Sequence, residues 1–515
     1  MKTIRALVDQ QALLRPQAVL AVDTESAAQL HFGELAQQLP DVDAWLTQAG
    51  AAAGQTVAVV MPNGLGTLRL LLAAMATGRC VVPVNLLSQA EVLQHVLDHS
   101  DCTLVVCVAE WQERVAAALA QLGRSVALRL ADPQALRLDG EWDGLAPAPT
   151  PTPSTTAAAA APSPQPADPA LLMYTSGTTG KPKGVQLTQA QLCANAHAIA
   201  AEHQLGAADR VLGVLPLYHI NAFVLTMLTP LATGGSVAMA PRFSAARFWA
   251  QAAATNCTWL NVVPTIVSFL LEGPAPPREQ VARLRFCRSA SAALPVEHLH
   301  AFEARFGIDI IETMGLTETA APAFSNPLDP ALRKAGAVGR ASGCEARVVD
   351  AQTLLPLPDG TTGEITIRGP QVMRGYYKDA AATKAAFTLD GWLRTGDLGR
   401  RDSDGFFFVT GRIKELIIKG GENIAPREID ETLLRHPDVL DAAVVGIPDR
   451  HYGQEIMACV VLRVGAQADE AQLLVFCEAQ LGRFKTPKVL RLVSDLPRGP
   501  SGKVQRLKLR DLAPP

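Results

Sequence analysis

The sequence has no segment that would carry the chain into a membrane or out of the cell. No apolar run in the 515 residues reaches the roughly 18 positions that a membrane-spanning helix needs. The chain starts with basic character, but Asp9, Gln10 and Gln11 interrupt the apolar core that a secretion signal requires. We therefore expect neither a transmembrane helix nor a signal peptide, and a cytoplasmic location.

Charge of one sign is not in excess, and cysteine pairs are missing. Lys and Arg number 46, Asp and Glu number 49, and the net charge is -3. This balance gives no reason to expect nucleic acid or an anionic membrane as a partner. The nine cysteines are odd in number, and the closest two, Cys102 and Cys107, lack metal-ligand spacing. We predict that the cysteines are reduced and mostly buried, with no disulfide and no zinc site.

A phosphate-binding loop is present, but it lacks the Walker signature. Residues 174–185 combine five hydroxyls, three glycines and two lysines, and such loops offer backbone N–H groups, hydroxyls and cations to phosphate oxygens. The apolar run 170–173 predicts a buried strand that holds the loop. Because Val185 and Gln186 follow Gly184 where a Walker loop has Lys and then Ser or Thr, that motif is excluded. A plain polar turn is the alternative interpretation.

Helix and strand signals alternate in the first third of the chain. The expected elements are the strands 57–61, 81–84 and 104–108 and the helices 65–77 and 90–100. Such alternation predicts parallel sheets covered by helices, and the pattern resumes from 211 to 311. Residues 146–169 consist almost entirely of Ala, Pro, Thr and Ser, which predicts a mobile surface linker inserted into this region.

The last third of the chain changes character twice. From about 336 to 411, closely spaced glycines separate short strands such as Glu364–Arg368, which predicts a small β-barrel or sandwich. After Gly411 we expect helices over 426–435 and 468–481 and strands over 442–445, 456–462 and 489–492. These elements predict a small α+β domain of about a hundred residues. The fold class is therefore α/β, with this α+β unit at the end.

Six further stretches combine polar, glycine and small residues in unusual ways. They are residues 216–221, 288–293, 312–319, 391–397, 411–424 and 496–503. The carboxylate and hydroxyls of 312–319 suit a hard cation that bridges phosphates, and the acid of 391–397 suits a ribose diol. Taken singly, each stretch is more often a turn or a solvated charge.

In this order and spacing, the motifs resemble the adenylate-forming (ANL) superfamily of acyl-CoA synthetases, peptide-synthetase adenylation domains and luciferase. The resemblance runs over nearly the whole chain. It implies a domain of two α/β subdomains and a β-barrel over 1–411, a small mobile domain over 412–515, and a hinge at Lys414. It also implies an acid–thiol ligase that uses ATP, Mg²⁺ and coenzyme A to activate a carboxylic acid.

The resemblance places site residues at matching motif positions. It implies phosphate contacts for Thr175, Ser176, Gly177, Thr178, Thr179 and Lys183; an α-phosphate contact for Thr317; a Mg²⁺ ligand in Glu318; ribose contacts for Asp397 and Arg412; an adenine border of Ser291, Ala292, Glu312, Thr313 and Met314; catalysis by Lys503; and a coenzyme A path past Gly420 and Gly421. The Lys503 loop is rich in glycine, so we expect it to close over the site and leave again.

The acid is the least constrained part of the prediction. The expected acyl pocket comprises His219, Asn221, Ser289, Ala290, Gly315 and Ala321. No aspartate follows the Tyr218 motif to hold an ammonium group, so an amino acid is not expected. The segment 285–340 resembles the oxalate-activating branch, except that Asn221 and Ala321 stand where that branch has histidines. We therefore expect a small organic acid other than oxalate, with a fatty or aromatic acid as the alternative.

Three other functions agree less well with the sequence. Loading of a carrier protein uses the same chemistry, but no carrier segment follows Pro515, so we expect free coenzyme A as the acceptor. A nucleotide sensor without activity would have lost Lys503, Glu318 or the phosphate loop, and all three are present. A phosphate-loop ATPase is disfavoured by the missing Walker signature. The oligomeric state is not predicted.

Overall fold

The phosphate-loop region and the motifs after it lie on two large sheets. The computed structural model describes residues 1–135, 163–175, 181–498 and 504–513. A nine-stranded sheet has the order β15-β14-β13-β12-β11-β9-β10-β1-β2. Its strands are β1 (Val19–Asp23), β2 (Gln29–His31), β9 (Arg210–Gly213), β10 (Ser236–Met239), β11 (Trp259–Val262), β12 (Phe286–Ser289), β13 (Ile310–Leu316), β14 (Ala321–Ser325) and β15 (Arg340–Ala341).

The second sheet has six strands in the order β6-β5-β3-β4-β7-β8. Its strands are β3 (Thr56–Val60), β4 (Cys80–Pro83), β5 (Leu104–Cys107), β6 (Ala127–Leu130), β7 (Pro169–Thr175) and β8 (Lys183–Thr188). In both sheets the inner pairings are parallel, and antiparallel strands lie at an edge. Parallel strands are covered on both faces, which explains why they are continuous apolar runs in the sequence.

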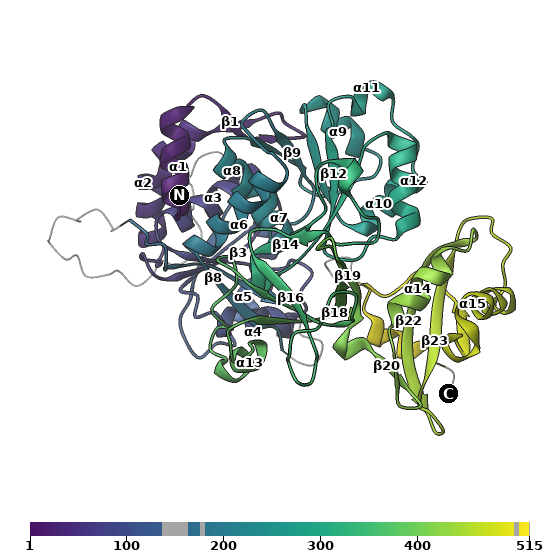
Figure 1. Cartoon of the computed structure of the whole chain (residues 1–515). Helices are drawn as coiled ribbons and strands as arrows, with labels where there is room; N and C mark the ends of the chain where they lie inside the picture. Colours follow the sequence, from purple (N-terminus) through teal and green to yellow (C-terminus); the bar gives the residue numbers. More distant parts are fainter. Residues whose placement is uncertain (136–162, 176–180, 499–503, 514–515) are drawn as a thin grey trace.

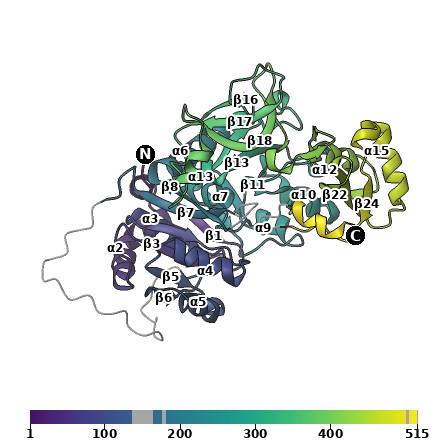
Figure 2. The same ribbon diagram turned by 90° about the horizontal axis from the view of Figure 1, so that it is seen from below.

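Helices fill the space between the two sheets and cover their outer faces (Figures 1 and 2). Every residue of α3 (Leu65–Ala76) is buried, because this helix lies in the main core with residues of both sheets. The other helices here are α1 (Ile4–Leu14), α2 (Phe32–Gln48), α4 (Ala90–His99), η1 (Ala109–Trp111), α5 (Gln112–Leu119), α6 (Gln189–Glu202), α7 (Ile220–Ala222), η2 (Phe223–Leu228), α8 (Thr229–Thr233), α9 (Phe248–Ala254), α10 (Pro264–Glu272), α11 (Arg278–Val281) and α12 (Val296–Phe306).

The glycine-rich segment predicted as a small β-barrel or sandwich forms a four-stranded antiparallel sheet in the order β16-β17-β18-β19. Its strands are β16 (Glu345–Val349), β17 (Gly363–Arg368), β18 (Leu393–Arg401) and β19 (Phe407–Arg412), with η3 (Thr317–Thr319), η4 (Pro330–Leu332) and α13 (Ala380–Ala386) nearby in sequence. Phe407 of β19 packs against Phe324 of β14 with 4.8 Å between ring centroids. This sheet is therefore fixed to the nine-stranded sheet by a shared apolar cluster.

The residues after β19 form a separate body beside the large one (Figure 1). Its strands are β20 (Ile417–Lys419), β21 (Glu422–Ile424), β22 (Val439–Asp449), β23 (Gly453–Leu462) and β24 (Val489–Leu492), and its helices are η5 (Ile413–Glu415), α14 (Pro426–Leu434), α15 (Glu470–Lys485) and η6 (Arg506–Leu512). The five strands make one mixed sheet, and their apolar faces form two small cores. Lys414, the predicted hinge, lies in η5 between β19 and β20.

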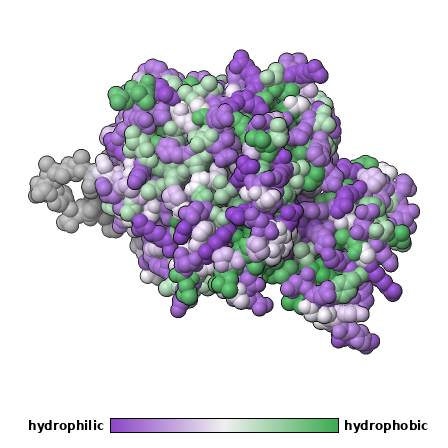
Figure 3. Space-filling model, in the orientation of Figure 1, coloured by the Kyte–Doolittle hydropathy of each residue, from purple (hydrophilic) through white to green (hydrophobic). Residues whose placement is uncertain are grey.

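The surface and the cysteines agree with the composition. Figure 3 shows hydrophilic and hydrophobic residues intermixed over the face of the molecule that it presents. Every cysteine except Cys344 is buried, which confirms the prediction of mostly buried thiols. Across the part of the chain that the structure describes, no helix combines the length and apolar character that a bilayer crossing needs.

Candidate active site

The phosphate loop connects two paired strands at the edge of the six-stranded sheet. Thr175 at the end of β7 pairs with Lys183 at the start of β8. The apolar residues Ala170–Met173 of β7 are buried, so both ends of the loop are held by a packed strand. Ser176, Gly177, Thr178 and Thr179, which were predicted as phosphate contacts, lie outside the described residues.

A tyrosine joins the phosphate loop to the predicted metal ligand. The ammonium nitrogen of Lys183 lies 4.9 Å from the ring centroid of Tyr376, within cation–π range. The Tyr376 hydroxyl donates a hydrogen bond of 2.8 Å to Oε1 of Glu318, in η3. Burial and the charge of Glu318 raise the pKa of Tyr376 well above its ordinary value, so the hydroxyl remains a donor at neutral pH. One tyrosine thus contacts Lys183 through its ring and Glu318 through its hydroxyl.

Backbone hydrogen bonds fix the segment that carries this tyrosine. The N–H of Met373 donates to the carbonyl of Glu318 at 2.8 Å, and the N–H of Tyr377 donates to the carbonyl of Gly184 at 2.8 Å. One segment therefore binds both β8 and η3, which are more than a hundred residues apart in the sequence. It sets the position of Tyr376 between them.

The predicted ribose residues form an ion pair on neighbouring strands. Asp397 of β18 and Arg412 of β19 are register partners, and Nε of Arg412 lies 2.7 Å from Oδ1 of Asp397. Asp397 is only 3% exposed. The pKa of Arg412 is raised chiefly by Asp397 and, more weakly, by Glu415 and Glu318. The ribose pair and the predicted metal ligand therefore lie close enough to interact electrostatically.

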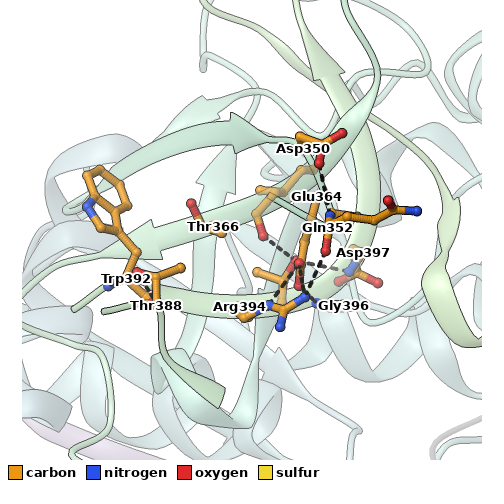
Figure 4. Close-up of polar contacts among 12 residues, drawn as sticks. Asp350, Gln352, Glu364, Thr366, Thr388, Trp392, Arg394, Gly396 and Asp397 are labelled. Carbon is orange, nitrogen blue, oxygen red and sulfur yellow. Dashed lines mark hydrogen bonds and ion pairs between the residues drawn. The ribbon is translucent and has the colours of Figure 1, made fainter. Parts of the chain in front are cut away.

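A buried glutamate holds the turn that presents Asp397 (Figure 4). Glu364 of β17 accepts hydrogen bonds from Arg394 at 3.0 and 2.7 Å and from the N–H of Gly396 at 3.1 Å. Gly396 has a φ of 70°, in the left-handed region where glycine avoids a Cβ clash. The N–H of Asp397 donates to the hydroxyl of Thr395 at 3.0 Å. These contacts fix the backbone on both sides of the carboxylate.

The predicted adenine border follows two neighbouring parallel strands. Ser289 at the end of β12 is the register partner of Glu312 in β13, so the segments 288–293 and 312–319 leave the sheet at the same edge. Such carboxyl ends are where open α/β sheets bind ligands. Ser291 has a φ of 75°, which is strained for a residue with a side chain. Its hydroxyl accepts a hydrogen bond of 3.4 Å from the Asn221 amide.

Thr313 and Met314 continue β13, where Thr313 donates to the carbonyl of Ser289 at 3.4 Å. Ala292 is exposed and follows Ser291 directly. The structure thus places Ser291, Ala292 and Glu312–Met314 around one sheet edge.

The predicted acyl residues fall into three groups. His219 precedes α7, Asn221 lies within it, and Asn221 accepts a hydrogen bond of 2.8 Å from Arg288 of β12. Gly315 of β13 pairs with Pro322 of β14, the residue after Ala321, and a Cβ on Gly315 would come within 2.1 Å of the Ala321 carbonyl oxygen. The strands can approach only because this position is glycine. Ser289 and Ala290, at the end of β12, are buried.

The predicted coenzyme A residues form the turn between β20 and β21. Gly420 and Gly421 have φ values of 58° and 87°, so both use the left-handed region. Lys503 lies outside the described residues, but both sides of its loop are placed, because Arg498 and Val504 form an isolated β-bridge. Arg498 also pairs with Asp441 and donates to the Thr265 hydroxyl of α10 at 3.4 Å. The base of the loop therefore contacts the large domain.

Three residues of this region were missed in the sequence. Tyr376 and Glu364 act through partners 58 and 32 residues away, and local patterns do not show such contacts. Arg288 stood in a run of small residues and was not assigned a role. Its signal was a charged side chain inside the short, otherwise uncharged strand Phe286–Ser289.

Glu312 is a buried carboxyl at the sheet edge, and its raised pKa predicts how stability depends on pH. It is 2% exposed, and its Oε1 accepts a hydrogen bond of 3.2 Å from the N–H of Leu294. Burial raises the pKa of Glu312 to about 7 from an ordinary value of 4.5. Between these values the folded state binds more protons than the unfolded state, so this group's contribution to stability is full below pH 4.5 and is lost as pH rises to 7.

We expect Glu312→Gln to remove this dependence. The melting temperature of the variant should rise relative to wild type between pH 5 and pH 8, by an amount equivalent to about 2–3 kcal/mol. Thermal unfolding across this pH range is the measurement, with Glu297→Gln at an exposed position as the control. A difference between Glu312→Gln and wild type that stays constant with pH would contradict the buried, protonated carboxyl.

The comparisons with known proteins cover the whole site. The family model for the AMP-binding enzyme matches residues 8–377, and the model for the AMP-binding enzyme C-terminal domain matches residues 428–503. A sulfoacetate–CoA ligase of Cupriavidus necator is 54% identical over 510 residues, which is 98% of this chain and 97% of the relative. An oxalate–CoA ligase of Arabidopsis thaliana is 36% identical over 90% of this chain and 89% of the relative. The crystal structure of ATP-bound MatB from Rhodopseudomonas palustris superposes with a TM-score of 0.89 at 30% identity, covering 99% of both chains.

Proposed function

Because this chain belongs to the AMP-binding enzyme family and is an acid–CoA ligase that uses ATP, we propose that it activates a small organic acid in two steps. In the first step a carboxylate oxygen of the acid attacks the α-phosphorus of ATP, and the bond to the leaving pyrophosphate breaks. In the second step the thiol of coenzyme A attacks the carbonyl carbon of the acyl-adenylate. AMP leaves with its oxygen, and the thiol proton passes to solvent.

The observation that carries this proposal is the path from Lys183 to Asp397. Lys183 lies over Tyr376, and Tyr376 donates to Glu318. Arg412 pairs with Asp397, and Glu318 contributes weakly to the raised pKa of Arg412. The path spans a cation at the phosphate loop, a carboxylate for a metal and an acid for a diol. That order matches the triphosphate, α-phosphate and ribose of one ATP molecule.

In this proposal each residue acts on one part of ATP. Thr175–Thr179 and Lys183 hold the β- and γ-phosphates, Thr317 contacts the α-phosphate, and Asp397 binds the ribose hydroxyls with Arg412 beside it. Lys503 approaches the non-bridging oxygens where negative charge is spread in the transition state. Ser291, Ala292 and Glu312–Met314 border the adenine.

Glu318 fits a hard cation such as Mg²⁺, which supplies charge neutralisation at phosphate oxygens when bound. The carboxylate has acceptor sites beyond the one hydrogen bond from Tyr376. Among the described residues, no group of three or more His, Cys, Asp and Glu side chains could hold a metal by itself. An ion here would take its remaining ligands from phosphates and water, as Mg²⁺ commonly does.

The C-terminal body serves both steps in this proposal. Its Lys503 loop takes part in adenylation, and rotation at Lys414 then brings Gly420 and Gly421 toward the acyl-adenylate. A Cβ at Gly421 would meet no atom within 4 Å, so the turn has no side chain to obstruct a thin pantetheine arm. We therefore propose domains of 1–411 and 412–515 that change their relative orientation between the two steps.

The relatives support a small acid as the substrate. The sulfoacetate–CoA ligase of Cupriavidus necator matches 98% of this chain at 54% identity, and the oxalate–CoA ligase matches 90%. Both named substrates are short acids. We propose a substrate of this size, which excludes fatty acids.

Pyrophosphate exchange over a panel of carboxylic acids tests the function. We expect exchange of label from pyrophosphate into ATP only when a short acid is present, and consumption of coenzyme A on its addition. ATP hydrolysis without any acid would contradict the proposal in favour of an ATPase, and no turnover would favour a nucleotide sensor. Acid-dependent exchange without coenzyme A consumption would indicate a carrier protein as the acceptor.

A further inference from the structure

Arg288 is a buried cation at the edge of the proposed acyl site. Its side chain is 1% exposed, and one terminal nitrogen donates hydrogen bonds of 2.8 Å to the amide oxygens of both Asn221 and Asn261. Two further N–H donors, Nε of Arg288 and Nδ2 of Asn261, have no partner among the described residues. Both donor atoms are buried. The cluster of Arg288, Asn221 and Asn261 therefore contains two unused hydrogen-bond donors beside a positive charge.

No carboxylate balances this charge within the described part of the chain. Asn221 and Asn261 are neutral, and burial lowers the pKa of Arg288 to about 9, which leaves it protonated at pH 7. His203 nearby is also neutral, since burial and the surrounding arginines lower its pKa to about 3. The sequence segments 176–180 and 499–503 contain no Asp or Glu.

Several other buried or half-buried arginines of the described chain have acidic partners. Arg79, also 1% exposed, pairs with Asp43. Arg394 pairs with the buried Glu364, and Arg506 pairs with Asp430. Burying an ion without a counter-charge is costly, and buried charges in proteins are normally paired. Arg288 instead contacts Asn221, whose amide donates to the hydroxyl of Ser291 at the proposed adenine border.

We propose that Arg288, with Asn221 and Asn261, binds a second anionic group of the substrate. The substrate class is then a short carboxylic acid that carries a sulfonate or a second carboxylate, with the reacting carboxylate directed to the α-phosphate. This inference rests on the proposed function and narrows its substrate. It supplies a partner for a second acidic group in a site where Asn221 and Ala321 stand in place of the histidines of the oxalate-activating branch.

The inference is tested by comparing how wild type and Arg288→Met discriminate between acids with and without a second negative charge. Sulfoacetate and 3,3-dimethylbutyrate have similar shapes, but only the first carries the second charge. We expect wild type to prefer sulfoacetate or malonate over 3,3-dimethylbutyrate in pyrophosphate exchange. Arg288→Met should lower kcat/KM for the dianionic acids about 10²–10³-fold, the scale for removing one partner of a buried charge pair. The value for 3,3-dimethylbutyrate should stay the same or rise.

Two variants separate a binding role from a structural one. Arg288→Lys keeps the charge and should retain the preference for dianionic acids at reduced rate. Arg285→Met removes a nearby arginine that already pairs with Asp209 at 2.6 Å, and should leave discrimination unchanged. Arg288→Met removes a buried charge but leaves the amide oxygens of Asn221 and Asn261 without their donor, so its melting temperature is compared with that of Arg288→Lys, which keeps a donor. Equal loss with all acids would overturn the inference.

Thermal shift distinguishes failure of this inference from failure of the ligase proposal. Sulfoacetate with ATP should stabilise wild type more than 3,3-dimethylbutyrate with ATP, and Arg288→Met should lose the difference. Stabilisation by sulfoacetate without turnover of any acid would contradict the ligase proposal while supporting the anion site. Turnover of acids without preference for a second charge would support the ligase and overturn the anion site. If Arg288→Met does not fold, Arg288→Lys and the wild-type preference still decide the outcome.

Discussion

Replacing Lys503 with alanine is expected to lower the rate of acyl-adenylate formation about 10²–10³-fold, the scale for losing one positioned donor to a charged transition state. Thioester formation from preformed acyl-adenylate should remain near the wild-type rate, because the α-phosphate has already been attacked in that substrate. The two half-reactions are measured separately, by pyrophosphate exchange and by coenzyme A consumption from synthetic acyl-adenylate.

Separate measurement of the two half-reactions is informative because the residue before the Lys503 loop contacts the large domain. Arg498, just before the loop, contacts Thr265 of the large domain, so the loop begins at the interface between the two bodies. Lys508→Ala, in the exposed part of η6, is the matched control and should leave both half-reactions unchanged. Equal losses in both half-reactions would show that Lys503 supports the fold or a shared binding step instead of adenylation.

Replacing Glu318 with glutamine should reduce adenylation by a similar factor, about 10²–10³-fold. The amide keeps the shape of the side chain but loses the charge that a divalent cation requires. Tyr376→Phe removes only the hydrogen bond to Oε1 of Glu318 and should cost less, about 10–100-fold, the usual range for a partner that orients a metal ligand. Exchange rates measured over a range of Mg²⁺ concentrations should show a weaker apparent Mg²⁺ affinity in both variants.

Tyr377→Phe is the control for this pair of variants. The Tyr377 hydroxyl donates to Asp101 at 2.8 Å, away from Glu318, so its removal should not change the dependence on Mg²⁺. Wild-type Mg²⁺ dependence in Glu318→Gln would contradict the assignment of Glu318 as the metal ligand. An unchanged Tyr376→Phe would show that the hydrogen bond is not needed to orient the carboxylate.

Local signals in the sequence predicted most elements, and pairing between strands decided their lengths. The strand 489–492 was predicted with the bounds that β24 has. The strand predicted over 442–445 extends to Val439–Asp449, because the neighbouring β23 pairs with it along its whole length, even through Pro448. The α/β pattern predicted to end at residue 311 continues in β13 to Leu316, where Gly315 permits close pairing with β14. Such extensions depend on a partner strand that the local pattern does not contain.

The ends of helices were also not predicted from the local sequence pattern. The helix predicted over 468–481 spans Glu470–Lys485, and its start is set by a capping box between Asp469 and Gln472. Near its other end, Gly482 has a φ of 73°, so the last turn departs from regular helix. Composition alone placed the helix but did not locate either end.

For the site, the sequence supplied motifs, and the fold supplied contacts between them. Asp397 and Arg412 were both predicted, and their pairing follows from the register of β18 and β19. Tyr376, Glu364 and Arg288 were not predicted, because each acts through a residue that is distant in the sequence. Their roles depend on burial and on hydrogen-bond partners, which become visible only when the strands are assembled.

The central claim is that the acid is activated as an acyl-adenylate, and the fate of the carboxylate oxygen tests it most directly. Sulfoacetate labelled with ¹⁸O in its carboxylate would be converted in the presence of ATP, Mg²⁺ and coenzyme A, and the products analysed by mass spectrometry. Attack on the α-phosphorus predicts one ¹⁸O atom in each AMP formed and none in pyrophosphate. Unlabelled AMP, or label in pyrophosphate or phosphate, would contradict the account.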